Sequence, residues 1–150
     1  MNLAVIFLYL NFGLNLTNAL SPTLAVTAGT LTVNLSNFRN DKGNAVVILF
    51  YGEKGFPKSP DKAMKILFVP IKGKRATAVF DNLRAGEYGI SVDHDENNNR
   101  KLDTNFLGIP KEGVGASNNA RGHFGPPKYS DAKFNFNGEN LTINIGINYL

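Results

Sequence analysis

A period-two alternation of apolar and polar residues recurs along this chain and limits its fold more than any other feature. The alternation is clearest over residues 141–148, where Leu and Ile alternate with Thr, Asn and Gly. Residues 30–35 show the same pattern, with Leu31, Val33 and Leu35 on one parity. Successive side chains of a β-strand point to opposite faces, so each of these segments predicts a strand with one buried face.

Seven segments are predicted as strands, and residues typical of turns separate them. They are residues 30–35, 45–51, 64–69, 75–80, 88–92, 133–136 and 141–148. Residues 45–51 are apolar on both parities, which predicts a central strand covered on both faces. No long helix is expected. We therefore predict an all-β fold, an antiparallel β-sandwich of about seven strands that is immunoglobulin-like or transthyretin-like, with a closed small barrel as the alternative.

The first 38 residues contain no Asp, Glu, Lys, Arg or His, and they include an uninterrupted apolar run over residues 3–10. A membrane-spanning helix needs about 20 predominantly apolar residues, so this run is too short to span a bilayer. It suits a secretory signal peptide, although no Lys or Arg precedes it. We predict a signal peptide over residues 1–28, export to the periplasm or the exterior, and no transmembrane span after cleavage. An N-terminal strand or buried helix of the domain is the alternative.

Composition removes several classes of function. The chain has no cysteine, which excludes disulfides, thiolate nucleophiles and cysteine-ligated zinc or iron–sulfur sites. Lys and Arg number 16 against 12 Asp and Glu, and a net charge of +4 spread over the chain is too small to indicate nucleic-acid binding. The 43 % share of apolar residues suffices for a packed core, so residues 29–150 are expected to form a single β-sandwich domain.

An Asp- and Asn-rich segment follows the fifth predicted strand, and its spacing matches the first half of an EF-hand calcium loop. When Asp95 is counted as position one, Asn97, Asn99 and Asp103 occupy positions three, five and nine. The backbone carbonyl of Lys101 would stand at position seven. Hard cations bind several oxygen ligands that converge on one point, and the alternating side chains of a curled loop supply such ligands.

Two positions depart from the EF-hand pattern. Position six, normally glycine for the sharp bend, is Arg100, and position twelve, normally a bidentate Glu, is Phe106. Asp93, two residues upstream of position one, is expected to supply the missing carboxylate. The predicted ligands of a weak Ca²⁺ site are therefore Asp93, Asp95, Asn97, Asn99 and Asp103. The alternative is an Asx-rich surface loop whose side chains bond their own backbone.

Residues 93–131 break the rhythm of strands and are predicted to form one long loop. Residues 104–131 lack strand periodicity but contain Gly, Pro and apolar residues that a polar linker would not carry. Long loops in compact domains are uncommon and often functional. We expect an ordered loop that is folded over one end of the sandwich and packed by Phe106, Phe124 and Tyr129, with an extra edge strand or a helical turn near Ser117.

Few residues of this chain indicate catalysis. The two histidines, His94 and His123, both fall in the irregular region, where they could approach each other. With Asp93 or Glu112 they would form a transition-metal site, whereas two surface or capping histidines are the alternative. Asp95 and Glu112 are conceivable as a glycosidase carboxylate pair. No nucleophile elbow, phosphate-binding loop or dinucleotide fingerprint is present.

Several short blocks together resemble a bacterial family, the domain of unknown function 2141 (DUF2141). The blocks are residues 83–88, 92–97, 101–103, 107–113, 117–119 and 124–127. The resemblance covers about residues 29–150, and it implies an exported β-sandwich protein without an established activity and without catalytic residues to carry over. The family usually has Asn-Gly where this chain has Asn99 and Arg100, so the resemblance leaves the sharp bend of the calcium loop in question.

These observations lead to one expected function and two alternatives. We expect an exported, non-enzymatic β-sandwich module that binds an envelope ligand or a protein partner through residues 93–131, with Ca²⁺ ordering that loop. One alternative is a hydrolase that acts on envelope polysaccharide or peptide, with Asp95, Glu112 or His123 at its centre. The other is an accessory domain with a purely structural role.

Overall fold

The computed structural model describes residues 28–150, so the predicted signal peptide lies outside the described residues except for Ala28. The strands are β1 (Ala28–Ser36), β2 (Asn44–Tyr51), β3 (Lys65–Pro70), β4 (Ala76–Arg84), β5 (Gly86–Asp95), β6 (Val114–Ala116), β7 (Phe134–Phe136) and β8 (Leu141–Gly146). The helical elements are η1 (Pro60–Lys62), η2 (Ser117–Asn119) and α1 (Tyr129–Ala132). The prediction of an all-β fold is confirmed. Within residues 28–150, no helix has the length and the apolar character that crossing a membrane requires.

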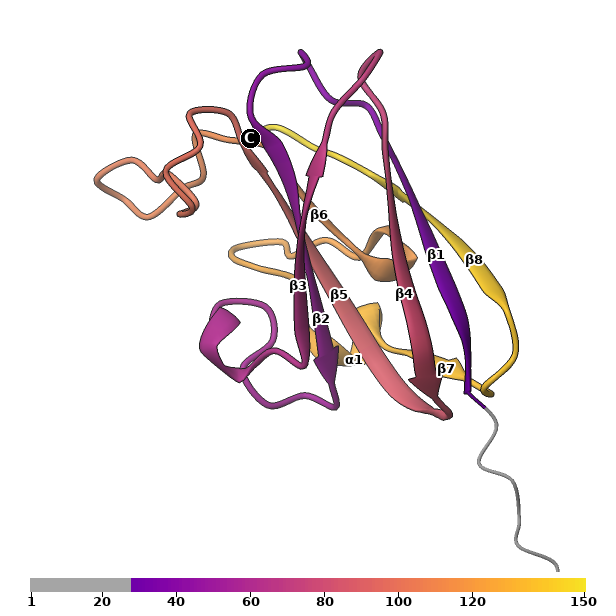
Figure 1. Cartoon of the computed structure of the whole chain (residues 1–150). Coiled ribbons are helices and arrows are strands. Elements are labelled where there is room, and N and C mark those ends of the chain that lie inside the picture. The colour runs from indigo at the N-terminus through magenta and orange to yellow at the C-terminus, as the bar shows by residue number, and fades with distance from the viewer. Residues whose placement is uncertain (1–27) are drawn as a thin grey trace, which may run out of the picture.

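The strands form two sheets that share one hydrophobic core (Figure 1). One sheet has the order β4-β1-β8, and the other has the order β3-β2-β5-β6, with β7 also pairing β5. The buried parity of each strand faces the core, as the sequence alternation predicts. The core includes Leu31, Val33, Leu35, Ala78, Phe80 and Ile145 from the first sheet and Ala45, Val47, Leu49, Tyr88, Ile90 and Val92 from the second.

Strand β2 is covered on both faces, which confirms the interpretation of its continuous apolar run. Its second face carries Val46, Ile48 and Phe50, which form a smaller buried cluster with the partly buried Phe56, Ala63 and Ile66. Phe56 and Ala63 belong to the connection between β2 and β3, which includes η1 and folds back over the outer face of the five-stranded sheet. The β2 run therefore carries two sets of apolar contacts, one for each face.

The sheets differ from the prediction in one pairing, and they include the extra edge strand, β6, that was expected as one option within residues 104–131. Strand β8 runs parallel to β1, with Leu31 opposite Leu141, whereas all other pairings between the strands are antiparallel. This parallel pair arises because the chain crosses from β7 in one sheet to β8 in the other through the turn at residues 137–140. The seven predicted strands are all present, and β6 is the eighth. An immunoglobulin-like or transthyretin-like arrangement remains a prediction.

The predicted long loop begins later and contains more regular structure than expected. Strand β5 continues three residues beyond its predicted end, through Asp93 and His94 to Asp95. The alternation persists because His94 takes the inward position after Tyr88, Ile90 and Val92 and is fully buried. Strand β6, η2 and α1 then divide the remainder, and η2 at Ser117–Asn119 matches the helical turn predicted near Ser117.

Candidate functional site

The Asp- and Asn-rich segment curls tightly through hydrogen bonds from its own backbone. The Oδ1 and Oδ2 atoms of Asp95 accept hydrogen bonds from the backbone N–H groups of Asn99 at 3.0 Å and of Arg100 at 2.9 Å. The Oδ1 atom of Asn97 accepts from the N–H of Asn99 at 3.0 Å, and Oδ1 of Asn99 accepts from that of Lys101 at 2.8 Å. Each of the latter bonds spans two residues and closes an Asx turn. We call residues 95–103 the Asx loop.

The bend at position six forms although that position lacks glycine. Arg100 has a φ of 62°, in the left-handed region that glycine usually occupies, and Asn98 has a φ of 57°. The guanidinium carbon of Arg100 lies 5.5 Å from the centre of the Phe68 ring, a cation–π contact. Arginine at this position therefore does not prevent the loop from curling.

Three of the predicted ligands converge on each other. The side-chain amide nitrogens of Asn97 and Asn99 donate to the two carboxylate oxygens of Asp103, at 2.7 Å and 3.0 Å respectively. These distances are those of ordinary hydrogen bonds from amide nitrogens to a carboxylate. They show that three of the predicted ligand side chains lie side by side.

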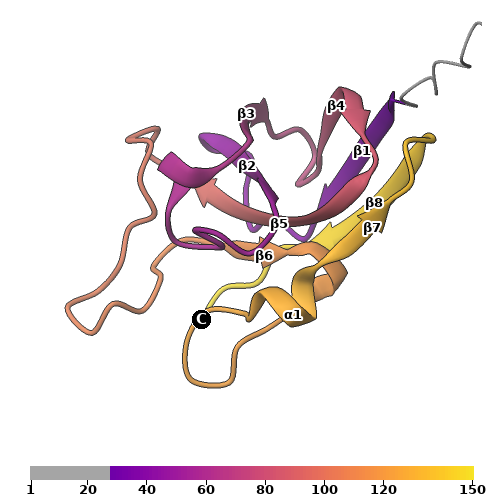
Figure 2. The same cartoon turned by 90° about the horizontal axis from the view of Figure 1, so that it is seen from below.

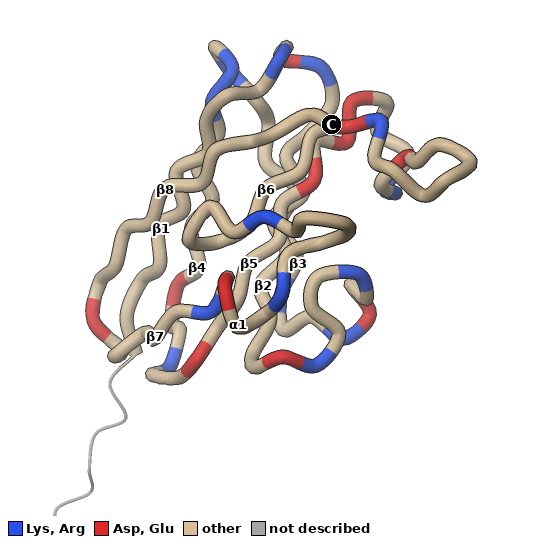
Figure 3. The backbone as a smooth tube through the Cα atoms, turned by 180° about the vertical axis from the view of Figure 1, so that it is seen from behind, with Lys and Arg blue, Asp and Glu red and all other residues tan. Residues whose placement is uncertain are grey.

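Glu112 joins the two ends of the Asx loop, a role that sequence reasoning missed. Its Oε1 accepts from the backbone N–H of Glu96 at 2.9 Å, and its Oε2 accepts from that of Asp103 at 3.0 Å. The Glu112 side chain is buried, with 4 % of the residue exposed. In Figure 3, acidic residues gather at the base of the protruding loop, beside β6. A lone Glu nine residues after the last Asx position gave no spacing signal that could have revealed this contact.

Asp93 lies in β5 rather than in the curl of the Asx loop. It pairs with Val46 on β2 and with Val114 on β6, on the face of the sheet that points away from the shared core. Burial, followed by the nearby charges of Glu112 and Asp95, raises the pKa of its carboxyl group from 3.8 to about 7. Asp93 therefore belongs to an acidic group with Asp95 and Glu112, and it has no hydrogen bond to the Asx loop among residues 28–150.

The two histidines have separate environments, which is contrary to the transition-metal hypothesis. His94 is fully buried, its Nε2 lies 2.8 Å from the carbonyl oxygen of Lys42, and its Nδ1 lies 2.7 Å from the hydroxyl of Tyr149. Because a carbonyl can only accept, Nε2–H is the donor to Lys42, and Nδ1 shares a hydrogen bond with the hydroxyl of Tyr149. Both ring nitrogens are engaged, whereas His123 lies in an exposed loop. Within the described residues, no three His, Cys, Asp or Glu side chains are grouped so that they could hold a metal ion.

Asp95 and Glu112 have no free carboxylate oxygen with which to act as an acid–base pair. All four of their oxygens accept backbone N–H groups of the segment between residues 96 and 103. Both residues are buried, with exposed fractions of 2 % and 4 %. These carboxylates hold the loop in shape, and the carboxylate of Asp103 accepts from the side-chain amides of Asn97 and Asn99.

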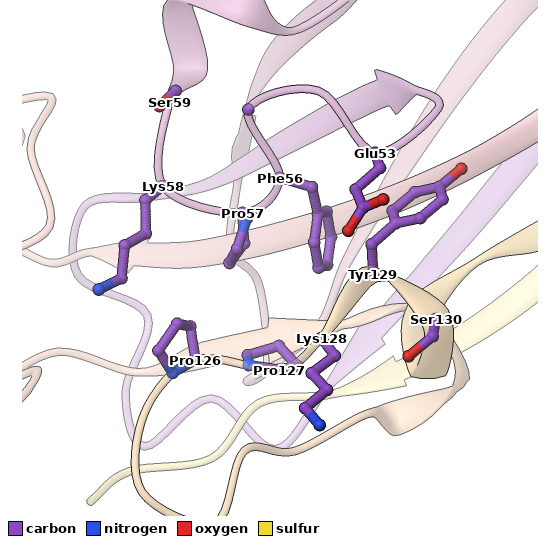
Figure 4. Close-up of a pocket in the computed structure, with 11 residues that line it drawn as sticks. Glu53, Phe56, Pro57, Lys58, Ser59, Pro126, Pro127, Lys128, Tyr129 and Ser130 are labelled. Carbon is purple, nitrogen blue, oxygen red and sulfur yellow. The ribbon is translucent and has the colours of Figure 1, made fainter.

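A shallow depression lies on the other end of the outer sheet face, between residues 53–59 and residues 126–130. Its volume is about 500 Å³. Figure 4 shows Phe56 and Pro57 facing Pro126 and Pro127 across it. The rim carries the side chains of Lys58 and Lys128 and that of Glu53.

Tyr129, at the side of this depression, is the one predicted loop aromatic that packs as expected. Its ring contacts Phe56 edge to face, with centroids 5.6 Å apart, and 7 % of the residue is exposed. Burial, followed by the neighbouring carboxylate of Glu87 and then by the charge of Glu53, raises the pKa of the Tyr129 hydroxyl to about 12. Figure 4 shows this hydroxyl pointing away from the depression.

Phe106 and Phe124 do not pack the loop region, and that prediction is wrong. Phe106 is 95 % exposed, and Phe124 is fully exposed. The loop does not need their packing because polar groups hold it: Glu112 joins its ends, and Oδ1 of Asn105 accepts from the N–H groups of Leu107 and Ile109. The sequence shows that this segment contains apolar residues, but it does not show whether their side chains are buried or point to solvent.

Comparison with known proteins identifies one family. The family described as "Uncharacterized protein conserved in bacteria (DUF2141)" has a model that matches residues 33–144, about three quarters of the chain. The match includes both sheets, the Asx loop and the depression. No curated protein and no solved structure matches the chain.

Proposed function

We propose that this chain, which belongs to the DUF2141 family of bacterial proteins, is an exported, non-enzymatic binding module whose Asx loop takes up a calcium ion. The observation that supports the proposal is the convergence of Asn97 and Asn99 on the carboxylate of Asp103 within a backbone curl held by Asp95. Oxygen ligands at alternating positions of a tight loop are what a hard cation requires.

Calcium would need a rearrangement of these side chains and of two turns of the loop. The amide groups of Asn97 and Asn99 turn their nitrogens toward Asp103, while their oxygens accept from the backbone N–H groups of Asn99 and Lys101. A half-turn of each amide would present oxygen to the ion and would open these two Asx turns. The ion would then lie among these two amide oxygens, the carboxylates of Asp95 and Asp103, and the carbonyl of Lys101. We place Asp93 outside this ligand set, where its ionised form would add negative charge near the ion.

Two carboxylates and two neutral amides make a site of modest affinity. Such a site belongs with the extracellular calcium modules, whose dissociation constants are on the order of 10⁻⁴ to 10⁻³ M. A site this weak is useful only where calcium is abundant, which is consistent with a protein that acts outside the cytoplasm. The non-enzymatic part of the proposal rests on the acidic and imidazole groups: the oxygens of Asp95 and Glu112 and the nitrogens of His94 all have structural partners.

Titration calorimetry with Ca²⁺ on the chelator-treated chain tests this proposal. The wild-type chain should bind one ion with millimolar or sub-millimolar affinity, and the ion should raise the thermal midpoint. Asp103→Asn keeps the shape of the side chain but removes its charge, so affinity should fall by about tenfold or more. Asp61→Asn, which changes an exposed carboxylate outside the loop, is the matched control and should bind like wild type. Absence of both heat and a thermal shift at millimolar Ca²⁺ would refute the site.

A further inference from the structure

The two most exposed large apolar side chains of the described residues lie on two loops that project from the same side of the molecule. Phe106 lies on the first tip, residues 104–110, and Phe124 lies on the second tip, residues 121–127. Leu107 and Ile109, with 68 % and 42 % exposure, extend the apolar surface of the first tip. Figures 1 and 2 show both loops standing away from the sheets in the same direction.

Hydrogen bonds within the first tip hold its apolar side chains outward. The backbone N–H of Asn105 donates to the carbonyl of Ile109 at 2.8 Å, and that of Gly108 donates back to the carbonyl of Asn105 at 2.9 Å. Thr104 and Pro110 form a bridge at the base. A closed hairpin of this kind keeps Phe106 and Leu107 exposed to solvent. Exposure of large apolar side chains to water is unfavourable, and contiguous exposed apolar surface marks sites of interaction.

The second tip is also constrained by its own backbone. A Cβ atom on Gly122 would lie 1.9 Å from the carbonyl oxygen of Gly125, so the chain closes tightly on itself there. At its start, the guanidinium group of Arg121 donates to the side-chain oxygen of Asn148. Phe124 therefore stands at the end of a compact turn.

Basic side chains predominate around both tips, although Glu53 lies across the depression from Pro126 and Asp131 is exposed just beyond the second tip. Arg100, Lys101 and Lys111 flank the first tip, where Asp103 is half-buried and Glu112 is buried. Residues 117–130 contain Arg121 and Lys128 and no Asp or Glu. In Figure 3 the ends of both loops are tan, acidic and basic residues lie together at the base of the first loop, and basic residues lie near the base of the second.

We propose that the two tips dock the protein on an anionic phospholipid bilayer, with Phe106, Leu107 and Phe124 entering the interface. The flanking Lys and Arg side chains would meet the phosphate head groups, each contributing about 1 kcal/mol near such a surface. Two separate convex tips with few apolar side chains suit a deformable interface better than a protein partner, which would need a matching groove for each. The inference rests on the proposed function in that it names the partner of the same module, but it does not require calcium.

Tryptophan placed at the tips provides a local test, because the chain contains no Trp. Phe106→Trp and Phe124→Trp variants of the full chain are mixed with vesicles of phosphatidylcholine and phosphatidylglycerol in equal amounts. Both emissions should shift to the blue and be quenched by brominated acyl chains. Val79→Trp, on the exposed face of β4 in the other sheet, is the control and should show neither effect. Because residues 3–10 are apolar as well, this local signal separates insertion of the tips from binding through that run.

Affinity measurements complete the test. Phe106→Ser combined with Phe124→Ser should weaken binding to the same vesicles by about tenfold or more, since each lost Phe removes apolar burial at the interface. Lys101→Gln combined with Lys111→Gln should weaken it by about fivefold for each charge and reduce its salt dependence. Unchanged emission at both tips, or full affinity of the double Ser variant, would overturn the proposal. A protein would then be the partner that binds the two tips.

The calcium proposal can fail or hold independently of this result. The double Ser variant retains every predicted calcium ligand, so its calorimetric titration should match that of wild type. Vesicle binding measured with calcium and with chelator should differ little if the tips act on their own. Loss of vesicle binding with intact calcium binding would refute only the docking inference, and the reverse result would refute only the calcium site.

Discussion

At the scale of single residues, Arg100 shows how this loop tolerates an unfavourable backbone. A non-glycine residue in the left-handed region costs roughly 1–2 kcal/mol, because its Cβ crowds the following carbonyl. The cation–π contact with Phe68 offsets part of that cost, by about 0.5–1 kcal/mol at an exposed position. The Asx loop therefore forms despite its residue at position six.

Comparing Arg100→Gly with Arg100→Ala isolates the backbone cost, because both variants lose the contact with Phe68. We expect the Gly variant to be more stable than the Ala variant by about 1 kcal/mol in urea unfolding, since φ is 62° at this position. The same pair of substitutions at Lys101, which lacks a positive φ, should give the opposite order. If Ala is the better residue at both positions, the left-handed bend is not present in solution.

The raised pKa of Asp93 leads us to expect that the stability of the fold depends on pH. Its pKa is raised from 3.8 to about 7 in the folded state, chiefly by burial, so the folded chain holds this proton more tightly than the unfolded chain. The free energy of unfolding should therefore fall as the pH rises from about 4 to about 7. Asp93→Asn should remove this fall and add about 2 kcal/mol of stability at about pH 8, which is less than the full linkage value because the side chain retains some solvent contact.

Chemical denaturation of chelator-treated protein across this pH range measures the effect. Asp61→Asn removes an exposed carboxylate and serves as the control, which should retain the wild-type dependence on pH. A parallel pH profile of Asp93→Asn and wild type would show that Asp93 is not the group responsible.

The residues of the Asx loop could be predicted from spacing, but their partners could not. Alternating Asx residues bond their own backbone at fixed offsets, so the curl formed by Asp95, Asn97 and Asn99 is a local property of the sequence. The contact of Glu112 with both ends of the loop depends on the return of the chain toward β6, which no local pattern encodes. The exposure of Phe106 likewise depends on which polar groups hold the loop.

At the scale of elements, β6 is confined between β5 and the end of β8. Gly113 precedes β6, and a Cβ atom there would lie 2.5 Å from Cγ2 of Ile147 and 2.6 Å from the ring of Tyr149. Val114 exchanges backbone hydrogen bonds with Asn148 just beyond β8. This glycine permits the close approach through which β6 links the two sheets.

Gly113→Ala should therefore destabilise the fold by about 1–3 kcal/mol, because a ring and a β-branched side chain must move to admit the methyl group. Gly125→Ala is the matched control, since a Cβ atom there meets nothing within 4 Å, and its effect should be near zero. Thermal and urea unfolding of both variants measure the difference. Equal stabilities would mean that β6 does not lie against Ile147 and Tyr149.

The strands themselves were largely predictable, because their alternation reflects burial on one face. Residues 141–148 and 30–35 match β8 and β1 closely. The direction in which these two strands pair could not be predicted from the sequence. A strand parallel to β1 has the same alternation of apolar and polar residues as an antiparallel one. The bounds of strand β6 could not be predicted, because three residues that include Gly115 are too few to show an alternation of apolar and polar side chains.

At the scale of the whole molecule, the two sheets cannot be separated without opening their common core. Ile145 on β8 is 1 % exposed, and its Cγ2 lies 2.9 Å from where a Cβ of Gly115 on β6 would be. The side chain thus reaches from the three-stranded sheet to the five-stranded one. Because one core serves both sheets, we expect residues 28–150 to unfold as a single cooperative unit.

Ile145→Ala tests this cooperativity. The substitution should cost about 2–5 kcal/mol, since it removes buried methylene and methyl groups and leaves a cavity. Native-state hydrogen exchange should then report the same loss of protection for the amides of Val47 and Ile90 in one sheet as for that of Val33 in the other. Val79→Ala, at a partly exposed position of β4, should change little and controls for the loss of a side chain. If protection fell only in β1 and β8, the sheets would be separate folding units, and the loops that β5 and β6 carry would have their own stability.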